Sequence, residues 1–451
     1  MCFVLGNRKI EKLKTENWKL VYIDSKKLKK KYKIMANTIF IIIIAILVFN
    51  YFFERILDYL NSTFWSNELP KELEDIYDSD KYRKSQDYEK TKHRFSLIVN
   101  TISFVIILFI LFFKGFGLLD DFIRQYTDNS ILLALLFFGI IGLVADILSI
   151  PSSAYGTFVI EEKFGFNKTT VRTFILDKIK GLILGAVIGG GLLSLIVWIY
   201  DTTANMFWVY VWIVLSIFSI FMTMFYSILI VPIFNKQTPL DQGELRDAIE
   251  KFAQKAGFKL KNIYVINGSK RSKKSNAYFS GLGTKKRIVL YDTLIKNHTI
   301  EELVAVLAHE IGHYKKKHIL LNIVLSVAQT GLMLFVLSLF IQKDSSLSLS
   351  LAQSLGAKES SFYIGILAFG LLYSPISLLL GIIMNAISRK HEFEADHFSG
   401  EKYNPESLQS ALKKLSVDNL SNLNPHPYYV FVYYSHPTLL QRLKALDALK
   451  H

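Results

Sequence analysis

The residues best suited to chemistry lie in residues 305–313, which read Ala-Val-Leu-Ala-His-Glu-Ile-Gly-His. His309 and His313 are four residues apart, so on a helix their imidazoles lie one turn apart on the same face. Two imidazoles placed in this way can bind one zinc ion, with Glu310 beside the open coordination position as a general base. The pattern predicts a catalytic metal site for hydrolysis.

The residues before the motif predict the helix that the motif needs. Thr299 and Glu302 have the spacing of a capping box, and an apolar run follows them. A helix should therefore begin near residue 300 and carry both histidines. Ala308 and Gly312 are small, and we expect them to leave room beside the metal.

Two histidines do not complete a catalytic zinc site, so a third ligand must come from elsewhere in the chain. Residues 391–396 read His-Glu-Phe-Glu-Ala-Asp and follow the last predicted membrane span. Because the last two spans form a hairpin, this segment returns to the side of the membrane that holds His309. Either Glu392 or Glu394 could complete a His₂Glu site, and spacing alone does not choose between them.

The composition is that of an integral membrane protein. The 451 residues are 51% hydrophobic and 14% aromatic, and the mean hydropathy is +0.29. The only cysteine is Cys2, which excludes an intrachain disulfide and a cysteine-based zinc site. The net charge is +15. In a membrane protein, excess lysine indicates topology and contact with anionic lipid, and no nucleic-acid-binding signature accompanies it.

Seven apolar segments are long enough to cross a bilayer, which takes about 20 residues. The sixth begins almost where the metal-binding helix should end, so the metal should lie at or inside the membrane boundary. The predicted fold is an all-α integral membrane protein with seven transmembrane helices and a small α+β element that carries the metal site. The predicted spans are residues 34–53, 95–113, 131–150, 181–200, 207–233, 319–341 and 362–384.

Two features within the spans invite specific expectations. Asp146 lies near the end of the third span, where an ionisable group is either functional or an interfacial helix-end residue, and we favour the second reading. Gly185 and residues 189–191 give the fourth span a surface of small residues, which predicts close helix packing.

The polar regions hold the remaining elements. Residues 240–256 have helical periodicity, and residues 262–266, 276–279 and 287–291 are predicted strands, the last two forming a hairpin. The Ser-Leu run at 345–351 is expected to be a polar turn. The chain then divides into a basic tail, five spans, a catalytic block, two spans and a second catalytic block, at residues 1–33, 34–233, 234–318, 319–384 and 385–451.

Several stretches together resemble the type I CAAX prenyl proteases, which are integral-membrane zinc endopeptidases. The resemblance runs from about the first loop to the C-terminus. It is carried by the metal motif and by residues 158–167, 268–272, 275–279, 287–294, 392–396 and 434–437. It implies one zinc ion per chain and a large chamber enclosed by the seven helices.

The resemblance also implies roles for residues outside the helix motif. In that family the third zinc ligand is the glutamate opening a Glu-[Phe/Tyr]-x-Ala-Asp motif, which here is Glu392. Asp396 lies one turn further on and would accept a hydrogen bond from a ligand imidazole. Glu394 should lie on another face of the helix, as a solvated residue.

Three further residues would act on the substrate according to the same resemblance. His436 would donate to the developing oxyanion, with Arg442 nearby. Asn276 would lie beside an edge strand that binds the substrate backbone by β-augmentation.

The expected substrate is a prenylated (farnesylated) CAAX protein, from which the C-terminal tripeptide is removed. Some members of the family also cut a prenylated precursor a second time, nearer its N-terminus. The expected location is the endoplasmic reticulum membrane, with the inner nuclear membrane as a further location. The partners are then this substrate and membrane lipid, without nucleic acid, and the sequence leaves the oligomeric state open.

The loops on the metal side are rich in lysine, so the positive-inside rule makes that side cytosolic. Residues 1–33 hold 11 Lys and Arg residues and, with seven spans, would face the lumen. We give the loops more weight than the tail, because several loops must share one side. The glycosylation sequons also fall on the metal side and should carry no glycan; they are Asn61, Asn167, Asn267, Asn297 and Asn419.

Two other hypotheses remain beside the prenyl protease. One is a membrane metalloprotease that cuts unlipidated proteins for quality control. The other is a non-enzymatic scaffold or transporter with a structural zinc ion.

Overall fold

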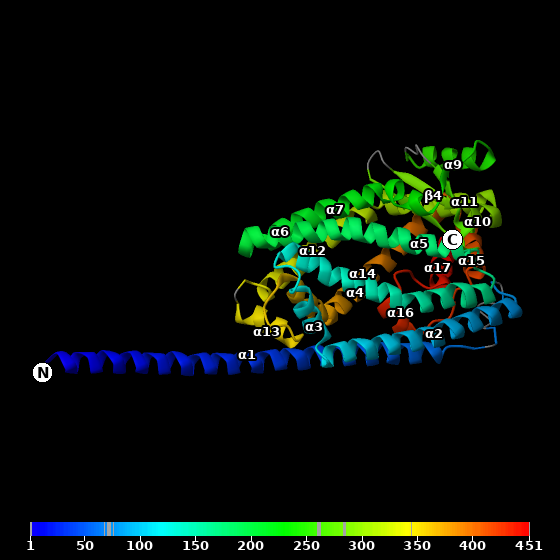
Figure 1. Ribbon diagram of the computed structural model, residues 1–451. Helices are drawn as coiled ribbons and strands as arrows, with labels where there is room; N and C mark the ends of the chain where they lie inside the picture. Colours follow the sequence, from blue (N-terminus) through cyan, green and yellow to red (C-terminus); the bar gives the residue numbers. More distant parts are fainter. Residues whose placement is uncertain are drawn as a thin grey trace.

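The computed structural model describes residues 2–66, 68–69, 74, 76–258, 263–282, 286–343 and 345–450, with side chains from residue 30 onward except Ala204. Within these residues, seven helical segments are long and apolar enough to cross a membrane, as predicted. A small sheet and several short helices gather at one end of the helical body (Figure 1). The predicted fold class is confirmed.

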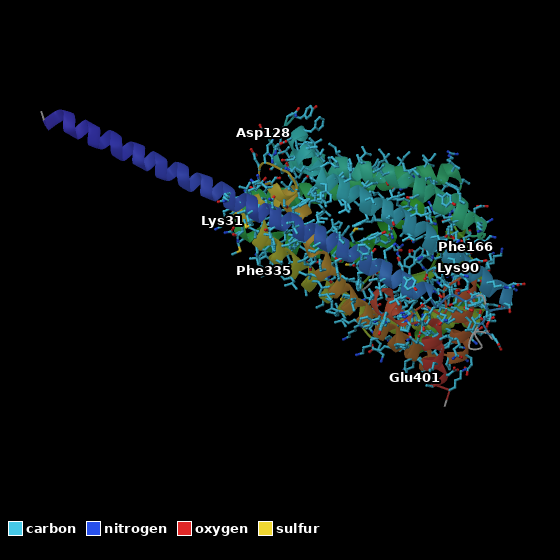
Figure 2. All side chains as sticks on the ribbon, turned by 90° about the horizontal axis from the view of Figure 1, so that it is seen from below. Lys31, Lys90, Asp128, Phe166, Phe335 and Glu401 are labelled. Atoms are coloured by element: carbon cyan, nitrogen blue, oxygen red, sulfur yellow. The ribbon has the colours of Figure 1, made fainter. Side chains whose placement is uncertain are left out.

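Helix α1 (Cys2–Ser62) is one straight element that includes the basic tail and the first span, Lys30–Ser62. It leaves the body of the protein near Lys31, far from the sheet (Figures 1 and 2). Asp128, in the turn between the second and third spans, lies at this same end, whereas Glu401 lies at the other. The tail and the metal motif are therefore on opposite sides of the membrane region, as an odd number of spans requires.

The remaining spans correspond closely to the predicted ones. The fourth consists of α5 (Val171–Leu184), a π-helical segment (Gly185–Gly189) and α6 (Gly190–Thr203). The others are α2 (Ser79–Phe112), α4 (Ser130–Tyr155) with its π-helical extension to Glu161, α7 (Phe207–Leu229), α12 (His318–Phe340) and α14 (Phe362–Lys402).

One sequence prediction about these helices is wrong and another is met only in part. A Cβ added at Gly190 would lie 3.6 Å from Leu135 of α4, whereas a Cβ at Gly185, Gly189 or Gly191 would meet nothing within 4 Å, so only Gly190 of the predicted surface faces a neighbouring helix. The Ser-Leu run belongs to helix α13 (Ser346–Ser354), not to a turn. Ser345 caps this helix by accepting from the backbone N–H of Ser348, and buried serines let it pack against α1 and α14. The serines suggested a turn, but Ser350 and Ser354 donate to the carbonyl oxygens of Ser346 and Leu351 within the helix.

Few apolar residues in the spans are buried. The buried share of each apolar stretch runs from 6% in Ser79–Phe112 and Phe207–Phe234 to 22% in His318–Phe340. A closely packed surface helix buries a stripe of at least about 100° of its circumference. Most apolar side chains of the spans therefore do not face other parts of the protein, as expected for helices that face lipid or line an enclosed chamber. The chamber itself stays a prediction.

The sheet contains four strands in the order β1-β2-β4-β3, with β2 and β4 parallel and the other pairs antiparallel. The strands are β1 (Gln237–Pro239), β2 (Ile263–Ile266), β3 (Ala277–Ser280) and β4 (Arg287–Tyr291). The predicted β3–β4 hairpin is confirmed; β1 was not predicted, because three residues ending in proline carry no alternation. The predicted first residue of β2, Asn262, lies outside the described residues.

One face of the sheet packs on helices α9 (Glu244–Lys255) and α11 (Ile300–Lys315), around a core that includes Ile288, Leu290 and Leu307. The remaining short helices connect or cover these elements. They are α3 (Gly115–Ile123), α8 (Val231–Phe234), α10 (Asp292–Asn297), α15 (Pro405–Asp418), α16 (Pro427–Tyr433) and α17 (Leu439–Asp447).

The metal motif lies on α11, which begins with the predicted capping box. Thr299 and Glu302 exchange side-chain and backbone hydrogen bonds at 2.9 and 3.3 Å. Gly312 has a different role from the predicted one. A Cβ there would lie 3.1 Å from the Cα of Ala395 and 3.2 Å from its carbonyl oxygen. Gly312 therefore lets α14 approach α11, which brings the last part of α14 to the metal motif.

We expect Glu302→Gln to reduce the free energy of unfolding by about 1.5–3 kcal/mol near neutral pH. Burial raises the pKa of Glu302, but the Lys414 ammonium, 2.7 Å away, and Ser410 outweigh this and lower it. A lowered pKa means that the carboxylate stabilises the fold above the unfolded-state pKa and loses this effect as pH falls through the folded-state value. Thermal unfolding in detergent, measured from neutral to acidic pH, gives the difference in stability between the variant and the unaltered protein. Glu301→Gln, at an exposed neighbouring position, is the control and should change little.

Candidate active site

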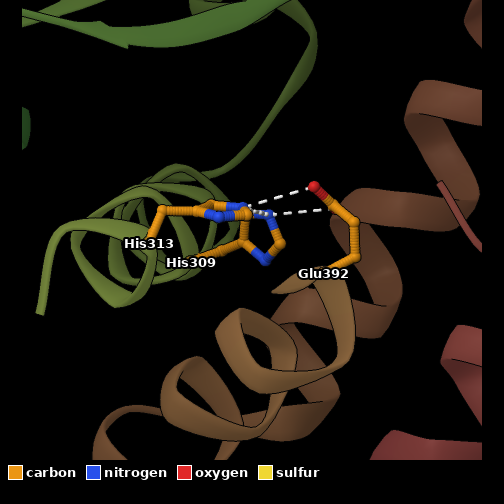
Figure 3. Close-up of side chains that lie close together, drawn as sticks. All are labelled: His309, His313 and Glu392. Carbon is orange, nitrogen blue, oxygen red and sulfur yellow. Dashed lines mark hydrogen bonds and ion pairs between the residues drawn. The ribbon is translucent and has the colours of Figure 1, made fainter. Parts of the chain in front are cut away.

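Three side chains converge where α11 meets α14 (Figure 3). The Nε2 atoms of His309 and His313 are 3.1 Å apart. Glu392 places one carboxylate oxygen 3.4 Å from His309 Nε2 and the other 3.3 Å from His313 Nε2. These are the residues whose donor atoms lie close enough together to hold one metal ion.

The spacing of the three donor groups fits a zinc ion. With metal–ligand distances of about 2.0–2.1 Å, the corners of a tetrahedron are about 3.3–3.4 Å apart. The observed separations of 3.1, 3.3 and 3.4 Å are close to that edge, and the last two involve different oxygens of Glu392, each facing one histidine. Glu392 Oε2 is buried and accepts no hydrogen bond. A buried carboxylate oxygen without a donor is costly, and a cation would remove this cost.

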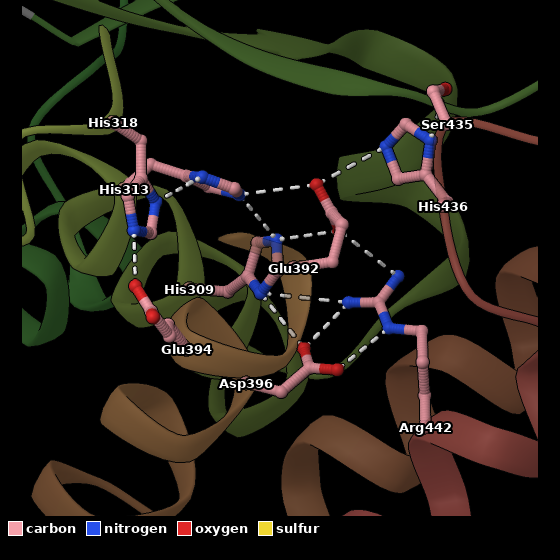
Figure 4. Close-up of polar contacts among 9 residues, drawn as sticks. All are labelled: His309, His313, His318, Glu392, Glu394, Asp396, Ser435, His436 and Arg442. Carbon is pink, nitrogen blue, oxygen red and sulfur yellow. Dashed lines mark hydrogen bonds and ion pairs between the residues drawn. The ribbon is translucent and has the colours of Figure 1, made fainter. Parts of the chain in front are cut away.

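His309 is oriented by a carboxylate on its far side (Figure 4). Its Nδ1 lies 2.9 Å from Asp396 Oδ1, so Nδ1–H donates and Nε2 is the nitrogen left for a metal. Burial lowers the pKa of His309, but Asp396 and Glu392 outweigh this and raise it to about 9, so near neutral pH a metal ion that binds at Nε2 replaces a proton. The same carboxylates make the imidazole a stronger ligand. Arg442 donates to both oxygens of Asp396, at 2.8 and 2.6 Å, and so holds Asp396 in place.

His313 is oriented through a second imidazole. His318 Nε2 donates to Glu394 Oε2 at 2.8 Å, which leaves His318 Nδ1 as an acceptor. His313 Nδ1 lies 3.0 Å from that atom and therefore donates to it, so His313 Nε2 keeps its lone pair. Figure 4 shows this chain from Glu394 through His318 to His313. The Nε2 atoms of His309 and His313 face each other across 3.1 Å, where they share a proton or, with a metal present, both bind the cation.

No role was predicted for His318, and Glu394 was expected to be solvated. Glu394 instead keeps only 36% of its side chain exposed and bonds to His318. The conformation of the turn between α11 and α12 explains why the sequence did not predict these contacts of His318. Lys317 adopts a left-handed conformation, φ 62°, and this folds His318 back onto His313. A His-x₄-His spacing after the motif was the available signal, but it does not match helical periodicity.

We expect His318→Phe to weaken zinc binding by about 10- to 100-fold, because His313 loses the acceptor that fixes its tautomer. Phenylalanine keeps the stacking on His391, whose ring lies 4.0 Å away. Glu394→Gln should weaken binding less, because the amide oxygen still accepts from His318. Competition with a zinc-sensitive dye measures these affinities in the metal-free protein. Glu401→Gln, at an exposed position on the same helix as Glu394, is the control. If His318→Phe bound zinc as tightly as this control, the orienting role of His318 would be contradicted.

Glu310 lies between the two histidines in sequence and is partly buried. Burial raises its pKa, while the charges of His309 and His313 act in the opposite direction. A carboxylate with a raised pKa is suited to accept a proton from water near neutral pH.

His436 lies on the other side of Glu392, with Nε2 3.3 Å from Glu392 Oε1 and Nδ1 3.0 Å from the Ser435 hydroxyl. Its side chain is 62% exposed, so it faces open space next to the three candidate ligands. The sequence placed His436 and the metal motif in different parts of the chain, and the structure brings them together (Figure 4).

A groove of about 730 Å³ runs alongside this cluster. It is lined by His436 and Arg442, by Asn276 at the start of β3, and by Lys92 and Lys274. Arg442 is not free to bind a substrate with its whole guanidinium, because two of its nitrogens hold Asp396. Its Nη1 lies 3.6 Å from Glu392 Oε2. All eight predicted site residues therefore lie in or next to one cluster. Arg442 also has a structural role, because it holds Asp396 in place.

Asp146 lies apart from this cluster and forms an ion pair with Lys178 of α5 at 3.0 Å. Lys178 also donates to Ser149 at 3.3 Å. The pair joins the third and fourth spans, and α4 continues past Asp146 to Tyr155, so Asp146 is not the helix-end residue that we favoured and it lies outside the candidate site.

Comparison with known proteins agrees with this geometry. Residues 239–450, which contain the cluster, match the model of peptidase family M48. Residues 58–236 match the model described as CAAX prenyl protease N-terminal, five membrane helices. CAAX prenyl protease 1 of Saccharomyces cerevisiae is 39% identical over 402 residues, covering 84% of this chain and 88% of that protein. The chain belongs to the CAAX prenyl protease family of M48 peptidases.

Two other relatives and one crystal structure are also similar to this M48 peptidase. The CAAX prenyl protease 1 homologues of Arabidopsis thaliana and Homo sapiens are 36% and 32% identical, and cover 90% and 85% of this chain and 96% and 90% of their own. The crystal structure of S. mikatae Ste24p superposes with a TM-score of 0.85 at 35% identity, over 91% of this chain and 99% of that one. This protein is a multi-pass membrane metalloprotease.

Proposed function

We propose that this protein is a zinc-dependent endopeptidase that removes the C-terminal tripeptide from prenylated CAAX proteins. The same site would also make a second, upstream cut in a prenylated precursor. The observation that carries the proposal is the meeting of Glu392, from the end of a membrane span, with the His-Glu-x-x-His helix. It is supported by the similarity to proteins named CAAX prenyl protease 1. A site at membrane depth suits a lipid-modified substrate.

In this proposal His309, His313 and Glu392 hold the metal. A zinc ion held there lowers the pKa of water and polarises a carbonyl group. Asp396 and the His318–Glu394 pair keep both imidazoles in the tautomer that binds metal.

Glu310 accepts a proton from the attacking water and later gives it to the leaving nitrogen. His436 donates a hydrogen bond to the oxyanion that develops on the scissile carbonyl; one such donor is worth on the order of 3–4 kcal/mol in other proteases. Arg442 supports both roles by fixing Asp396 and by lying beside Glu392.

The substrate backbone would pair with β3. Among the residues that the structure describes, β3 pairs only with β4, and its other edge is free. An extended peptide can add to such an edge with main-chain hydrogen bonds. Asn276 is exposed at the beginning of this strand and lines the groove, where its side chain can contact the peptide.

A peptide ending in a farnesylated CAAX sequence tests the proposal. We expect release of the last three residues, inhibition by a chelator and recovery with zinc. The same peptide without the prenyl group should be a poor substrate. Equal cleavage of both peptides would instead support a quality-control protease, and no cleavage of either would support a non-enzymatic role.

We further propose that the metal side faces the cytosol from the endoplasmic reticulum membrane. The five sequons all lie in the half of the structure that holds the metal site. For example, Asn61 accepts a hydrogen bond from His426, and Asn419 donates one to Ser275. Glycan on any of them in the native protein would overturn this orientation.

The division of the chain at 233/234 is supported by the boundary between the two family matches, at residues 236 and 239.

A further inference from the structure

A cavity of about 480 Å³ lies beside the far end of β3, and none of the residues assigned above to the reaction lines it. Its walls come from three elements that are distant in sequence. They are Met222, Thr223 and Tyr226 of α7, Tyr278 to Gly281 of β3 and the turn after it, and Ile319 of α12. Apart from Thr223 and Ser280, these walls are apolar or aromatic or have no side chain, and pockets for small ligands commonly hold about 300–1,000 Å³.

The cavity is close to the metal cluster. Ile319 directly follows His318, whose Nδ1 lies 3.0 Å from the ligand residue His313. Tyr278 and Phe279 belong to the strand whose first neighbour, Asn276, lines the catalytic groove. The groove and the cavity are therefore at the two ends of one edge strand.

The aromatic wall has a fixed orientation. The Tyr278 hydroxyl interacts with Ser227 Oγ at 3.3 Å and with Gln237 Nε2 at 3.2 Å. Phe279 packs against Phe258 and Tyr314, with ring centroids 6.1 and 5.8 Å apart. The polar end of Tyr278 is thus satisfied outside the cavity, and its ring is left as an apolar surface.

The two ends of β3 differ in chemistry, and this orients a bound substrate. The Asn276 end is polar and suits the residues that carry the free C-terminal carboxylate. Lys92 and Lys274 lie along this groove in ion pairs with Glu89 and Glu161. A peptide that pairs antiparallel to β3 with its C-terminus there runs back toward Ser280 with its N-terminal side. In a CAAX protein the prenylated cysteine is on that side of the cleaved bond.

We infer that the cavity between α7, α12 and the end of β3 binds the isoprenoid chain of the substrate. The inference rests on the proposed function, because it takes the substrate to be prenylated. Two membrane spans form one wall, so an isoprenoid could pass between this cavity and the bilayer without crossing a polar surface. The cavity then sets the preference for a prenylated over an unmodified peptide, whereas the metal cluster sets the rate of hydrolysis.

The test fills the cavity from α7 with Thr223→Trp and compares one peptide in farnesylated and S-methylated forms. We expect KM for the farnesylated peptide to rise about tenfold or more, because contacts worth several methylene groups are lost. Cleavage of the S-methylated peptide should change less than about twofold. Ile217→Trp is the matched control, since Ile217 is 64% exposed on the same helix and lies outside the cavity.

The outcomes separate this inference from the proposed function. If the unaltered protein cleaves both peptides equally, the proposed function fails. If it prefers the farnesylated peptide and Thr223→Trp leaves that preference unchanged, only the cavity assignment is overturned.

A second measurement needs no substitution. A peptide with a photoreactive isoprenoid should label residues 222–226 or Ile319 of the unaltered protein. Labelling confined to other segments would overturn the inference, as would labelling of the cavity by a photoreactive phospholipid that farnesylated peptide does not displace.

Discussion

Glu310→Gln should lower kcat for a farnesylated peptide by about 10²- to 10⁴-fold, the range that a general base contributes. Glutamine has nearly the same shape as glutamate but cannot accept the proton of the attacking water. The proposed metal donors are the two histidines and Glu392, so the variant should still bind one zinc ion. KM should change little, because the lost interaction belongs to the transition state. Single-turnover cleavage and metal analysis of the same preparation measure both quantities.

The control for this variant is Glu301→Gln, an exposed position on the same helix. It should retain full activity and zinc content. Unchanged turnover by Glu310→Gln would remove Glu310 as the base and would bring back the hypothesis of a structural zinc ion. A variant that lost zinc as well as activity would show that Glu310 supports the site in another way.

Glu392→Gln should cost both metal and activity. The substitution removes the negative charge that lies 3.3 and 3.4 Å from the two histidine nitrogens. The loss of zinc affinity should exceed the about 10- to 100-fold expected for a residue that only orients a ligand. Excess zinc should restore part of the activity if the amide oxygen still binds, which distinguishes this variant from Glu310→Gln.

Glu394→Gln is the matched control, since both glutamates lie on the same stretch of α14. It should keep the zinc ion with a smaller loss of affinity. If Glu394→Gln lost the metal and Glu392→Gln retained it with unchanged affinity, the assignment of the third ligand would be reversed. Zinc titration of both metal-free proteins decides between these outcomes.

The sequence was sufficient for the parts of the site that local periodicity controls. The four-residue spacing of His309 and His313 and the capping box at Thr299 specify one helix with one reactive face, and the structure contains that helix. The seven spans were also predictable, because apolar length decides them. Glu392 could be placed on the correct side of the membrane by topology, but choosing it over Glu394 required the family resemblance.

What the sequence could not provide depends on turns and on contacts between distant segments. His318 reaches His313 only because Lys317 takes a left-handed conformation, which a lysine does not predict. Gly312 seemed to make room for the metal, whereas it makes room for Ala395 of α14. The cavity beside β3 was likewise invisible, since Met222 and Ile319 are almost a hundred positions apart in the chain.

Helix α14 gives the bilayer a mechanical role in metal binding. It continues without interruption from Phe362, in the membrane, to Lys402, beyond Glu392. The 30 residues between Phe362 and Glu392 span about 45 Å, so a tilt of the whole helix by about 1° would move the carboxylate by about 0.8 Å. Pro375 lies within this length, and α11, which carries the histidines, packs against α14 at Gly312 and Ala395. Only the part of the tilt that α11 does not follow changes the separation of the ligands. Zinc affinity measured in bilayers of different thickness should therefore report the tilt of the seventh span.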